Sequence, residues 1–381
     1  MSTQLSRRRF LHGSSLAAAA LGLPGLVAAS PAASTAPVAS TGPQAGPVLL
    51  NFNECPHGPV PAAVAAARDI VPASGRYLFG LGRELATEFA TQNGLPVDHV
   101  AVYGGSSDPL DRAALAFTSA SAPVVIPDPT FEAVADTAAR HGATVHRVPL
   151  RADGSHDVRA MAAAAPDAGL VYVCNPNNPT GSVTARAELD WLLANKPASS
   201  VLLVDEAYIH YSDERSMLDR VAAGDDIVVL RTFSKLYGMA GLRLGLALGR
   251  PELLAKLAAY GGNPLPVTAL AAGLASLRDA DVVPQRRREN AALRERTIAW
   301  LQARGFACLP SAANCFMVDV GGDGKAFAAA MAERGVVIGR AWPVWPHRVR
   351  VTVGTEAEMA RFREVFAEVA ADGGRPAAAS A

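Results

Sequence analysis

One lysine of the chain, Lys235, stands where covalent chemistry is favoured. It lies between a hydrophobic run at residues 226–230 and a glycine-rich turn, which suits an amine that condenses with an aldehyde to form a Schiff base. The nearby hydroxyl groups of Thr232 and Ser234, together with Arg243, suit the binding of a phosphate group. The segment therefore predicts a lysine that holds a phosphorylated aldehyde, and a solvated loop lysine is the alternative.

Two further polar residues belong to loops that follow apolar runs. Asp205 comes directly after the run at residues 201–204, and a carboxylate in a dry cavity is costly unless it is paired. A protonated nitrogen of an aromatic ring is such a partner, and the pair keeps that ring an electron sink. Asn178 lies between two prolines in the segment at residues 175–181, which suits an amide that must be held in place. An exposed aspartate at a strand end is the simpler interpretation of Asp205.

A glycine turn is the third candidate motif. Gly104 and Gly105 follow an apolar run, and Ser106 and Ser107 then open a helical pattern. The free backbone N–H groups and the dipole at the start of a helix suit a phosphate group. An ordinary helix start has the same pattern, so this motif gains weight only beside the others.

The elements that must position these residues alternate along the chain. Helices are predicted at residues 83–92, 108–118 and 132–141, and strands at 100–103, 124–126, 144–148, 171–174, 201–204, 227–230 and 242–248. Unbroken apolar strands of this kind favour a mostly parallel sheet that helices cover on both faces. Ligands bind at the carboxyl ends of such strands, and the candidate residues lie at those ends.

The pattern changes after residues 264–266. A long helical region is predicted to extend to Arg304, followed by strands at 316–320, 336–339 and 349–353 and by a helix at 324–334. Thr355 and Glu358 form a capping box that opens the last helix. This part of the chain predicts a smaller α+β domain.

The motifs occur in order over residues 50–370 and resemble those of the fold-type I pyridoxal-phosphate enzymes, specifically the histidinol-phosphate aminotransferase branch. The resemblance implies an α/β fold, with a large domain whose mostly parallel sheet is sandwiched by helices and a smaller α+β C-terminal domain. It implies pyridoxal 5'-phosphate as cofactor, with Lys235 as its covalent partner and Asp205 on its ring nitrogen. Asn178 and Tyr208 are then expected to hydrogen-bond its phenolic oxygen.

The same resemblance implies roles for residues outside those motifs. Phe131 matches the ring, usually a tyrosine, that stacks on the pyridine ring. Tyr77 matches a tyrosine that reaches across a homodimer to the phosphate group of the neighbouring site. Asn53 and Glu54 match an entry segment that lines the substrate mouth, although Cys55 replaces an asparagine there.

Two arginines match substrate-binding residues of the family. Arg350 matches the arginine that grips the substrate α-carboxylate, for which a planar guanidinium is suited. Arg348 alternates to the same face of that strand and competes for the assignment. Arg340 matches the arginine that contacts the distal group of the substrate, with Gly339 where the family often has an aliphatic residue. Asn314 is expected to border the substrate pocket.

The composition limits the partners of the chain. Its 381 residues include 35 Lys+Arg and 35 Asp+Glu, and this zero net charge gives no basis for nucleic-acid binding. Zero net charge also weakens repulsion between copies, which fits the implied homodimer. The four cysteines have no metal-ligand spacing, so no metal site is predicted.

The first residues predict a targeting signal. Residues 6–11, Ser-Arg-Arg-Arg-Phe-Leu, match the twin-arginine pattern, and the apolar stretch at residues 16–29 is too short and too weakly apolar for a stable membrane span. We expect residues 1–29 to be a signal peptide that the twin-arginine translocation machinery recognises, and the folded enzyme to be periplasmic or extracellular. A disordered basic tail is the alternative.

The remaining chain is expected to divide into four segments. Residues 30–47, rich in Ala, Ser, Pro and Gly, predict a flexible linker. An N-terminal arm at 48–75, a large cofactor-binding domain at 76–265 and a small C-terminal domain at 266–381 follow.

These observations predict an aminotransferase that moves an amino group from a small amino-acid-like donor to a 2-oxo acid, with Lys235 as general base. Histidinol phosphate is the donor that the resemblance implies. An exported enzyme is not needed for histidine biosynthesis, and the Trp- and Pro-rich residues 341–346 depart from the usual loop. An aromatic or general amino-acid aminotransferase therefore stays open. A related lyase or decarboxylase would use the same residues, and the intact motif set disfavours a non-catalytic cofactor-binding protein.

Overall fold

The computed structural model describes residues 46–372. The predicted signal peptide and most of the predicted linker lie outside these residues. Within the described part, no helix is both long enough and apolar enough to cross a membrane.

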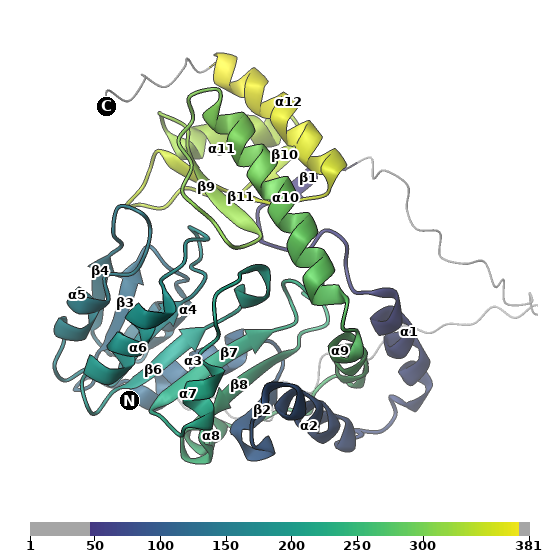
Figure 1. Ribbon diagram of the computed structural model, residues 1–381, viewed down its shortest axis with the longest axis vertical. Coiled ribbons are helices and arrows are strands. Elements are labelled where there is room, and N and C mark those ends of the chain that lie inside the picture. Colours follow the sequence, from purple (N-terminus) through teal and green to yellow (C-terminus); the bar gives the residue numbers. More distant parts are fainter. Residues whose placement is uncertain (1–45, 373–381) are drawn as a thin grey trace, which may run out of the picture. The chain divides into compact units, whose positions relative to one another are not determined.

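A seven-stranded sheet forms the centre of the larger part of the structure (Figure 1). Its strand order is β2-β8-β7-β6-β5-β3-β4, and β8 runs antiparallel to both of its neighbours while the others are parallel. The prediction of a mostly parallel sheet is therefore confirmed. The strands are β2 (Val100–Tyr103), β3 (Val124–Asp128), β4 (Val145–Pro149), β5 (Leu170–Cys174), β6 (Val201–Asp205), β7 (Ile227–Thr232) and β8 (Gly245–Gly249). The strand expected at residues 242–248 thus begins three residues later than predicted.

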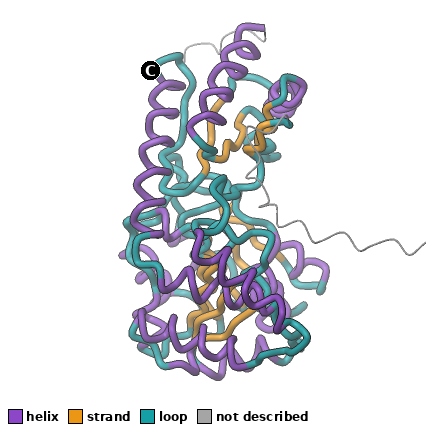
Figure 2. Tube along the Cα trace, turned by 90° about the vertical axis from the view of Figure 1, so that its right-hand side faces the viewer, coloured by secondary structure: helices purple, strands orange, loops and turns teal. Residues whose placement is uncertain are grey.

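Helices flank the strands of this sheet (Figure 2), so the central strands are apolar on both faces. β5 and β6 are buried at every residue. The first predicted helix ends as expected, because Gly94 takes a left-handed conformation with φ of 64°. The helices are α1 (Pro61–Ile70), α2 (Gly80–Asn93), α3 (Ser107–Phe117), α4 (Ala133–Arg140), α5 (Val158–Ala163), α6 (Arg186–Asn195), α7 (Leu218–Ala222), α8 (Pro251–Ala258) and α9 (Val267–Arg278).

The smaller part contains two two-stranded sheets. β11 (Arg348–Thr352) pairs antiparallel with β9 (Cys315–Asp319), and β1 (Val48–Leu50) pairs parallel with β10 (Val336–Ile338). Three helices complete this part: α10 (Val282–Gln302), α11 (Gly324–Glu333) and α12 (Glu356–Asp372). The capping box is confirmed, because the N–H of Thr355 donates to Glu358 at 2.6 Å and the N–H of Glu358 donates to Thr355 Oγ1 at 3.3 Å.

The long helical region predicted after residue 266 is two helices, α9 and α10, separated by residues 279–281. The interruption has a local cause: the Asp279 backbone is extended, and its carboxylate accepts from the N–H of Asp281 at 3.1 Å. This turn lets α10 leave α9 and run toward α12 (Figure 1).

Two hydrophobic cores meet along α10, whose first residue, Val282, belongs to the larger core, while Leu293 and Leu301 belong to the smaller one. The larger core contains the sheet, and Ala269 and Leu270 of α9 belong to it. The smaller core contains Leu50 of β1 together with side chains from Leu293 to Val369. The boundary between the two cores therefore lies within α10, and β1 contributes to the smaller core. The expected division of the chain at residue 265 stays a prediction.

Candidate active site

The carboxyl ends of β2, β3, β5, β6 and β7 meet the start of β8 around a cavity of about 270 Å³, which we call the strand-end pocket. Most of the predicted site residues line it. These are Ser106, Ser107, Phe131, Asn178, Asp205, Tyr208, Thr232, Ser234, Lys235, Arg243 and Arg350. Glu54 lines it as well. The sheet topology brings these residues together because parallel strands end at one edge.

Lys235 follows β7 and is half-buried. Its Nζ donates a hydrogen bond to the carbonyl oxygen of Phe52 at 3.1 Å and lies 5.7 Å from the centre of the Tyr208 ring. Burial, aided by the positive charge of Arg350, lowers the pKa of the Lys235 amine to about 8. A larger fraction of this amine is therefore neutral near pH 7 than in an ordinary lysine, and a neutral amine is a nucleophile and a base.

Asp205 is the last residue of β6 and is 3% exposed. One carboxylate oxygen accepts from the N–H of Ala207 at 3.0 Å, and the other accepts from the hydroxyl of Tyr172 at 3.4 Å. Both donors are neutral, so burial dominates and raises the pKa of Asp205 to about 6. Such a carboxylate is suited to face a cation in the pocket.

The glycine turn and Arg243 form a compact group of hydrogen-bond donors. Arg243 has a φ of 61°, and its Nη1 donates to Ser234 Oγ at 3.2 Å. Gly105 has a φ of 96°, and a Cβ on it would lie 2.4 Å from Nη2 of Arg243. Ser106 and Ser107 follow at the start of α3. The guanidinium and the helix start therefore meet at one corner of the strand-end pocket, and the positive φ of Gly105 favours a glycine there.

Arg350 enters the pocket from β11 of the smaller part. Its Nη1 donates to Asn178 Oδ1 at 2.6 Å, and its Nη2 donates to the carbonyl oxygen of Asn51. Its guanidinium carbon lies 5.5 Å from the centre of the Trp342 ring. Arg348, the competing candidate, lies 3.6 Å from the carboxylate of Asp319 instead. The structure therefore favours Arg350 over Arg348 as the arginine of this pocket.

Four residues expected at this site do not line the pocket, and one of them is Asn314, which lines a separate cavity instead. Asn53 is 1% exposed, and its Nδ2 donates to the hydroxyl of Tyr208 at 3.1 Å, so it lies behind that ring and not on the lining. Tyr77 is 65% exposed and stacks on Phe79 with ring centres 5.4 Å apart. Arg340 is paired with Glu132 and lies 4.5 Å from the centre of the Trp342 ring.

Some lining residues were not predicted from the sequence: Phe52, Cys174, Ala207 and Ala240. The sequence predicts Cys174 only as the last residue of the strand at residues 171–174. It ends β5 in register with Asp205 at the end of β6, and this strand-end position was the signal that could have marked it. Ala207 and Ala240 carry no chemical signal in the sequence.

The comparisons with known proteins agree with this geometry. The family model described as aminotransferase class I and II matches residues 45–366. A histidinol-phosphate aminotransferase of Symbiobacterium thermophilum is 39% identical over 332 residues, which cover 86% of this chain and 91% of that protein. An aromatic amino acid aminotransferase of Cutibacterium acnes is 35% identical over 327 residues, 84% of this chain and 92% of that protein. The crystal structure of the Sinorhizobium meliloti histidinol-phosphate aminotransferase in complex with pyridoxal-5'-phosphate superimposes with a TM-score of 0.80 at 26% identity, covering 86% of this chain and 92% of that one.

Proposed function

The chain belongs to the class I and II aminotransferase family, and from this premise we propose that it transfers the amino group of histidinol phosphate to a 2-oxo acid. The predictions of an enzyme, of the aminotransferase class and of pyridoxal 5'-phosphate as cofactor are confirmed by the family match and by the relative solved with that cofactor. The observation that carries the proposal is the meeting of Lys235, Asp205 and Arg350 in one pocket at the strand ends.

The residues of the strand-end pocket fit the cofactor. The buried carboxylate of Asp205 has only neutral hydrogen-bond donors, so a protonated ring nitrogen would supply its missing cation. The corner between Gly105 and Arg243 leaves no room for a Cβ, and its donors suit a phosphate group. Thr232 and Ser234 bring hydroxyl groups to the same side of the pocket. When bound, pyridoxal phosphate supplies a reactive aldehyde carbon and a ring that withdraws electrons from the neighbouring carbon.

The side chains of the pocket have separate roles in the proposed reaction. Lys235 would hold the cofactor by condensing with its aldehyde, with release of water, and its amine, once freed by the donor, would take and return the proton of the donor carbon, for which a pKa of about 8 is well placed. Asp205 holds a proton on the ring nitrogen. Asn178 and Tyr208 hydrogen-bond the phenolic oxygen, and Phe131 lies against the ring. These assignments make the pocket an acid–base site whose side chains are positioned by the carboxyl ends of five strands.

Arg350 orients the donor through its anionic group. A guanidinium binds a carboxylate or a phosphate through paired N–H groups, so the charge of histidinol phosphate suits it. Phe52, 67% exposed, and Phe131, 36% exposed, present aromatic faces to the pocket, which suit the flat ring of the donor. Arg340 is expected to contact the distal part of the donor after leaving Glu132.

An aromatic amino acid is the second candidate donor, because it shares a planar ring and an anionic group with histidinol phosphate. The ring of Trp342 lies within 5.5 Å of both Arg340 and Arg350, but it is 5% exposed and does not line the pocket, so it supports these arginines without facing the donor. The relative from Cutibacterium acnes supports the aromatic donor.

A panel of amino donors with 2-oxoglutarate tests the proposal. We expect kcat/KM for histidinol phosphate to exceed that for phenylalanine by about tenfold or more, which corresponds to 1.4 kcal/mol of transition-state stabilisation. The reverse order would assign the enzyme to aromatic amino acids. Amine loss or carbon dioxide release without any 2-oxo acid would instead indicate a lyase or a decarboxylase.

The active enzyme is further proposed to be a homodimer in which Tyr77 reaches the neighbouring site. The exposed, stacked pair of Tyr77 and Phe79 supports this, because large exposed aromatic side chains are typical of interfaces. Mixing a Lys235→Ala protein with a Tyr77→Ala protein is expected to restore activity, since hybrid dimers contain one site with both residues intact. No recovery after subunit exchange contradicts the shared site.

Export of the folded enzyme by the twin-arginine route is proposed from residues 6–11 alone. A double substitution, Arg7→Lys with Arg8→Lys, is expected to keep the protein inside the cell, and fractionation measures this. Unchanged export of the double variant contradicts the targeting assignment.

A further inference from the structure

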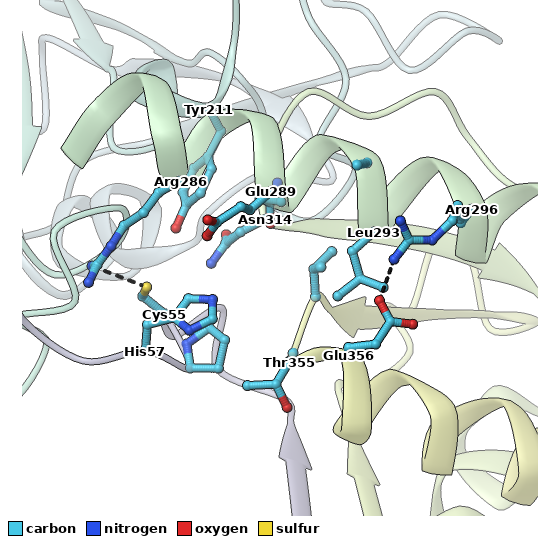
Figure 3. A pocket seen from close by; sticks show the side chains of 15 residues that line it. Cys55, His57, Tyr211, Arg286, Glu289, Leu293, Arg296, Asn314, Thr355 and Glu356 are labelled. Carbon is cyan, nitrogen blue, oxygen red and sulfur yellow. Dashed lines mark hydrogen bonds and ion pairs between the residues drawn. The ribbon is translucent and has the colours of Figure 1, made fainter. Parts of the chain in front are cut away.

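A second cavity, of about 360 Å³, lies beside α10, and we call it the α10 pocket. Figure 3 shows that side chains of α10 reach into it, facing the segment at residues 55–57 and the turn that precedes α12. Its residues include Cys55, Tyr211, Arg286, Glu289, Leu293, Asn314, Val353 and Glu356. None of its lining residues belongs to the lining of the strand-end pocket.

Two charges of opposite sign face this cavity without an ionic partner among residues 46–372. Arg286 uses its Nη1 to donate to the carbonyl oxygen of Leu236 at 2.8 Å and to Cys55 Sγ at 3.5 Å. Glu289 accepts only from the neutral amide of Gln285, at 2.9 Å. Burial raises the pKa of the Cys55 thiol, so the thiol is neutral and leaves the charge of Arg286 uncompensated.

The other charged pair of the cavity is satisfied internally. Arg296 and Glu356 form an ion pair across it, as Figure 3 shows. The free charges are therefore Arg286 and Glu289, which stand three residues apart on one face of α10. Cβ atoms at this spacing are about 5–6 Å apart, which allows two side chains to bind the two ends of one small molecule.

Asn314, which lines the cavity, has a buried polar atom without a partner among the described residues. Asn314 is 1% exposed, and its Nδ2 donates to the carbonyl oxygens of Asn53 at 3.0 Å and of Glu54 at 3.3 Å. Its Oδ1 is buried and has no hydrogen-bond partner within the described part of the chain. A buried amide oxygen in this state costs free energy that a ligand N–H group would recover.

One side of the lining is apolar, and polar side chains complete the rest of it. Leu293 is 7% exposed and Val353 is 3% exposed, and Ala292 and Pro56 complete this side. Besides its internal ion pair, the cavity thus combines one cation and one anion that are unpaired within residues 46–372, an acceptor without a partner there and an apolar side.

We propose that the α10 pocket binds a free α-amino acid with an apolar side chain. The carboxylate binds the guanidinium of Arg286, the ammonium group binds Glu289 and Asn314 Oδ1, and the side chain packs on Leu293 and Val353.

This site is placed to act on the reaction. The bound amino acid would lie against residues 55–57, and the residues just before them supply Phe52 and Glu54 to the strand-end pocket. Phe52 also accepts the hydrogen bond of Lys235. An amino acid in the α10 pocket therefore acts as an effector and changes the KM for the amino donor.

Calorimetric titration of the cofactor-loaded enzyme with L-leucine tests the binding site. The titration is done in the Arg350→Gln background, which removes the guanidinium of the strand-end pocket. We expect leucine to bind there, and its affinity to fall by about tenfold or more with Glu289→Gln and with Arg286→Gln. Arg288→Gln and Glu295→Gln, which change exposed charges of α10 outside the pocket, are expected to leave the affinity unchanged.

The result that overturns the proposal is an absence of leucine binding in the Arg350→Gln background, or an affinity that neither variant changes. If the affinity for leucine falls in only one of the two variants, the ligand is not bound as a zwitterion. The visible absorption of the bound cofactor checks that each variant is folded, and Glu289→Gln decides alone if Arg286→Gln fails this check.

Initial rates test the effector role. Leucine that competes in the strand-end pocket changes the donor KM equally in the wild-type enzyme and in Glu289→Gln. We expect a change of about twofold or more in the wild type beyond that seen in Glu289→Gln. Equal changes in both proteins overturn the effector role.

Discussion

Replacing Asp205 by Asn is expected to stabilise the cofactor-free protein while it destroys activity. The structure raises the pKa of this carboxyl from 3.8 to about 6 because it is buried beside neutral donors. Each pKa unit corresponds to about 1.4 kcal/mol between the two protonation states. The ionised carboxylate therefore costs the folded wild type about 3 kcal/mol at pH 7.5, and an asparagine of the same shape removes this cost.

The sign of the effect fixes its pH dependence. A folded-state pKa above the unfolded value means that the folded protein binds the proton more tightly. The wild type is therefore stabilised most below pH 3.8 and loses this stability as the pH rises through about 6. The advantage of Asp205→Asn is expected to be full at pH 7.5 and about half as large at pH 5.

Denaturant unfolding of the cofactor-free proteins at these two pH values measures the free energy of unfolding. With cofactor, the order changes: the wild type is expected to gain more stability from pyridoxal phosphate than the variant, because only the carboxylate pairs with a protonated ring nitrogen. Turnover of the loaded variant is expected to fall by about 100- to 1000-fold. A variant less stable than the wild type at pH 7.5, or an advantage that does not depend on pH, refutes the reasoning.

Three further changes test other parts of the pocket. Lys235→Ala is expected to abolish the visible absorption of the cofactor after dialysis. In the wild type, the rate of cofactor association should rise about tenfold per pH unit up to about pH 8, the pKa of Lys235. A rate that rises up to pH 10 contradicts this pKa. Arg350→Lys should raise the donor KM by about 10- to 100-fold, because a lysine cannot form the paired N–H contacts; initial rates measure this. Gly105→Ala should weaken cofactor binding by about tenfold or more, because its Cβ would lie 2.4 Å from Arg243 and displace the guanidinium. An unchanged affinity in equilibrium dialysis would contradict the assignment of this corner to phosphate binding.

The sequence predicted the strand-end pocket well because one physical rule governs it. Asp205 ends β6 and Lys235 follows the neighbouring parallel strand β7, and apolar runs of four residues show where these strands end. Side chains just beyond those ends must converge, whatever the details of the loops. Ser106 and Asn178 were found by the same rule.

The rule did not extend to residues that reach their place through longer paths. Asn53 lies in an entry segment after β1, a strand of three residues that pairs with β10 nearly 290 positions away, and nothing in the local pattern shows that its side chain turns behind Tyr208. Arg340 lies between β10 and β11, where its partner Glu132 belongs to the larger part. Such contacts depend on how the smaller part packs on the larger one, and local periodicity carries no information about that packing.

The contact between Arg350 and Asn178 shows what this packing adds to the chemistry. A guanidinium only donates hydrogen bonds, so Arg350 must occupy the amide oxygen of Asn178, 2.6 Å away. The amide then has only its NH2 group left for the cofactor, which is the group that an anionic phenolic oxygen requires. Arg350 therefore fixes the orientation of Asn178, in addition to the role in donor binding that we propose for it. Because Arg350 belongs to β11 and Asn178 follows β5, any movement of the smaller part changes the donor site and the cofactor contact together.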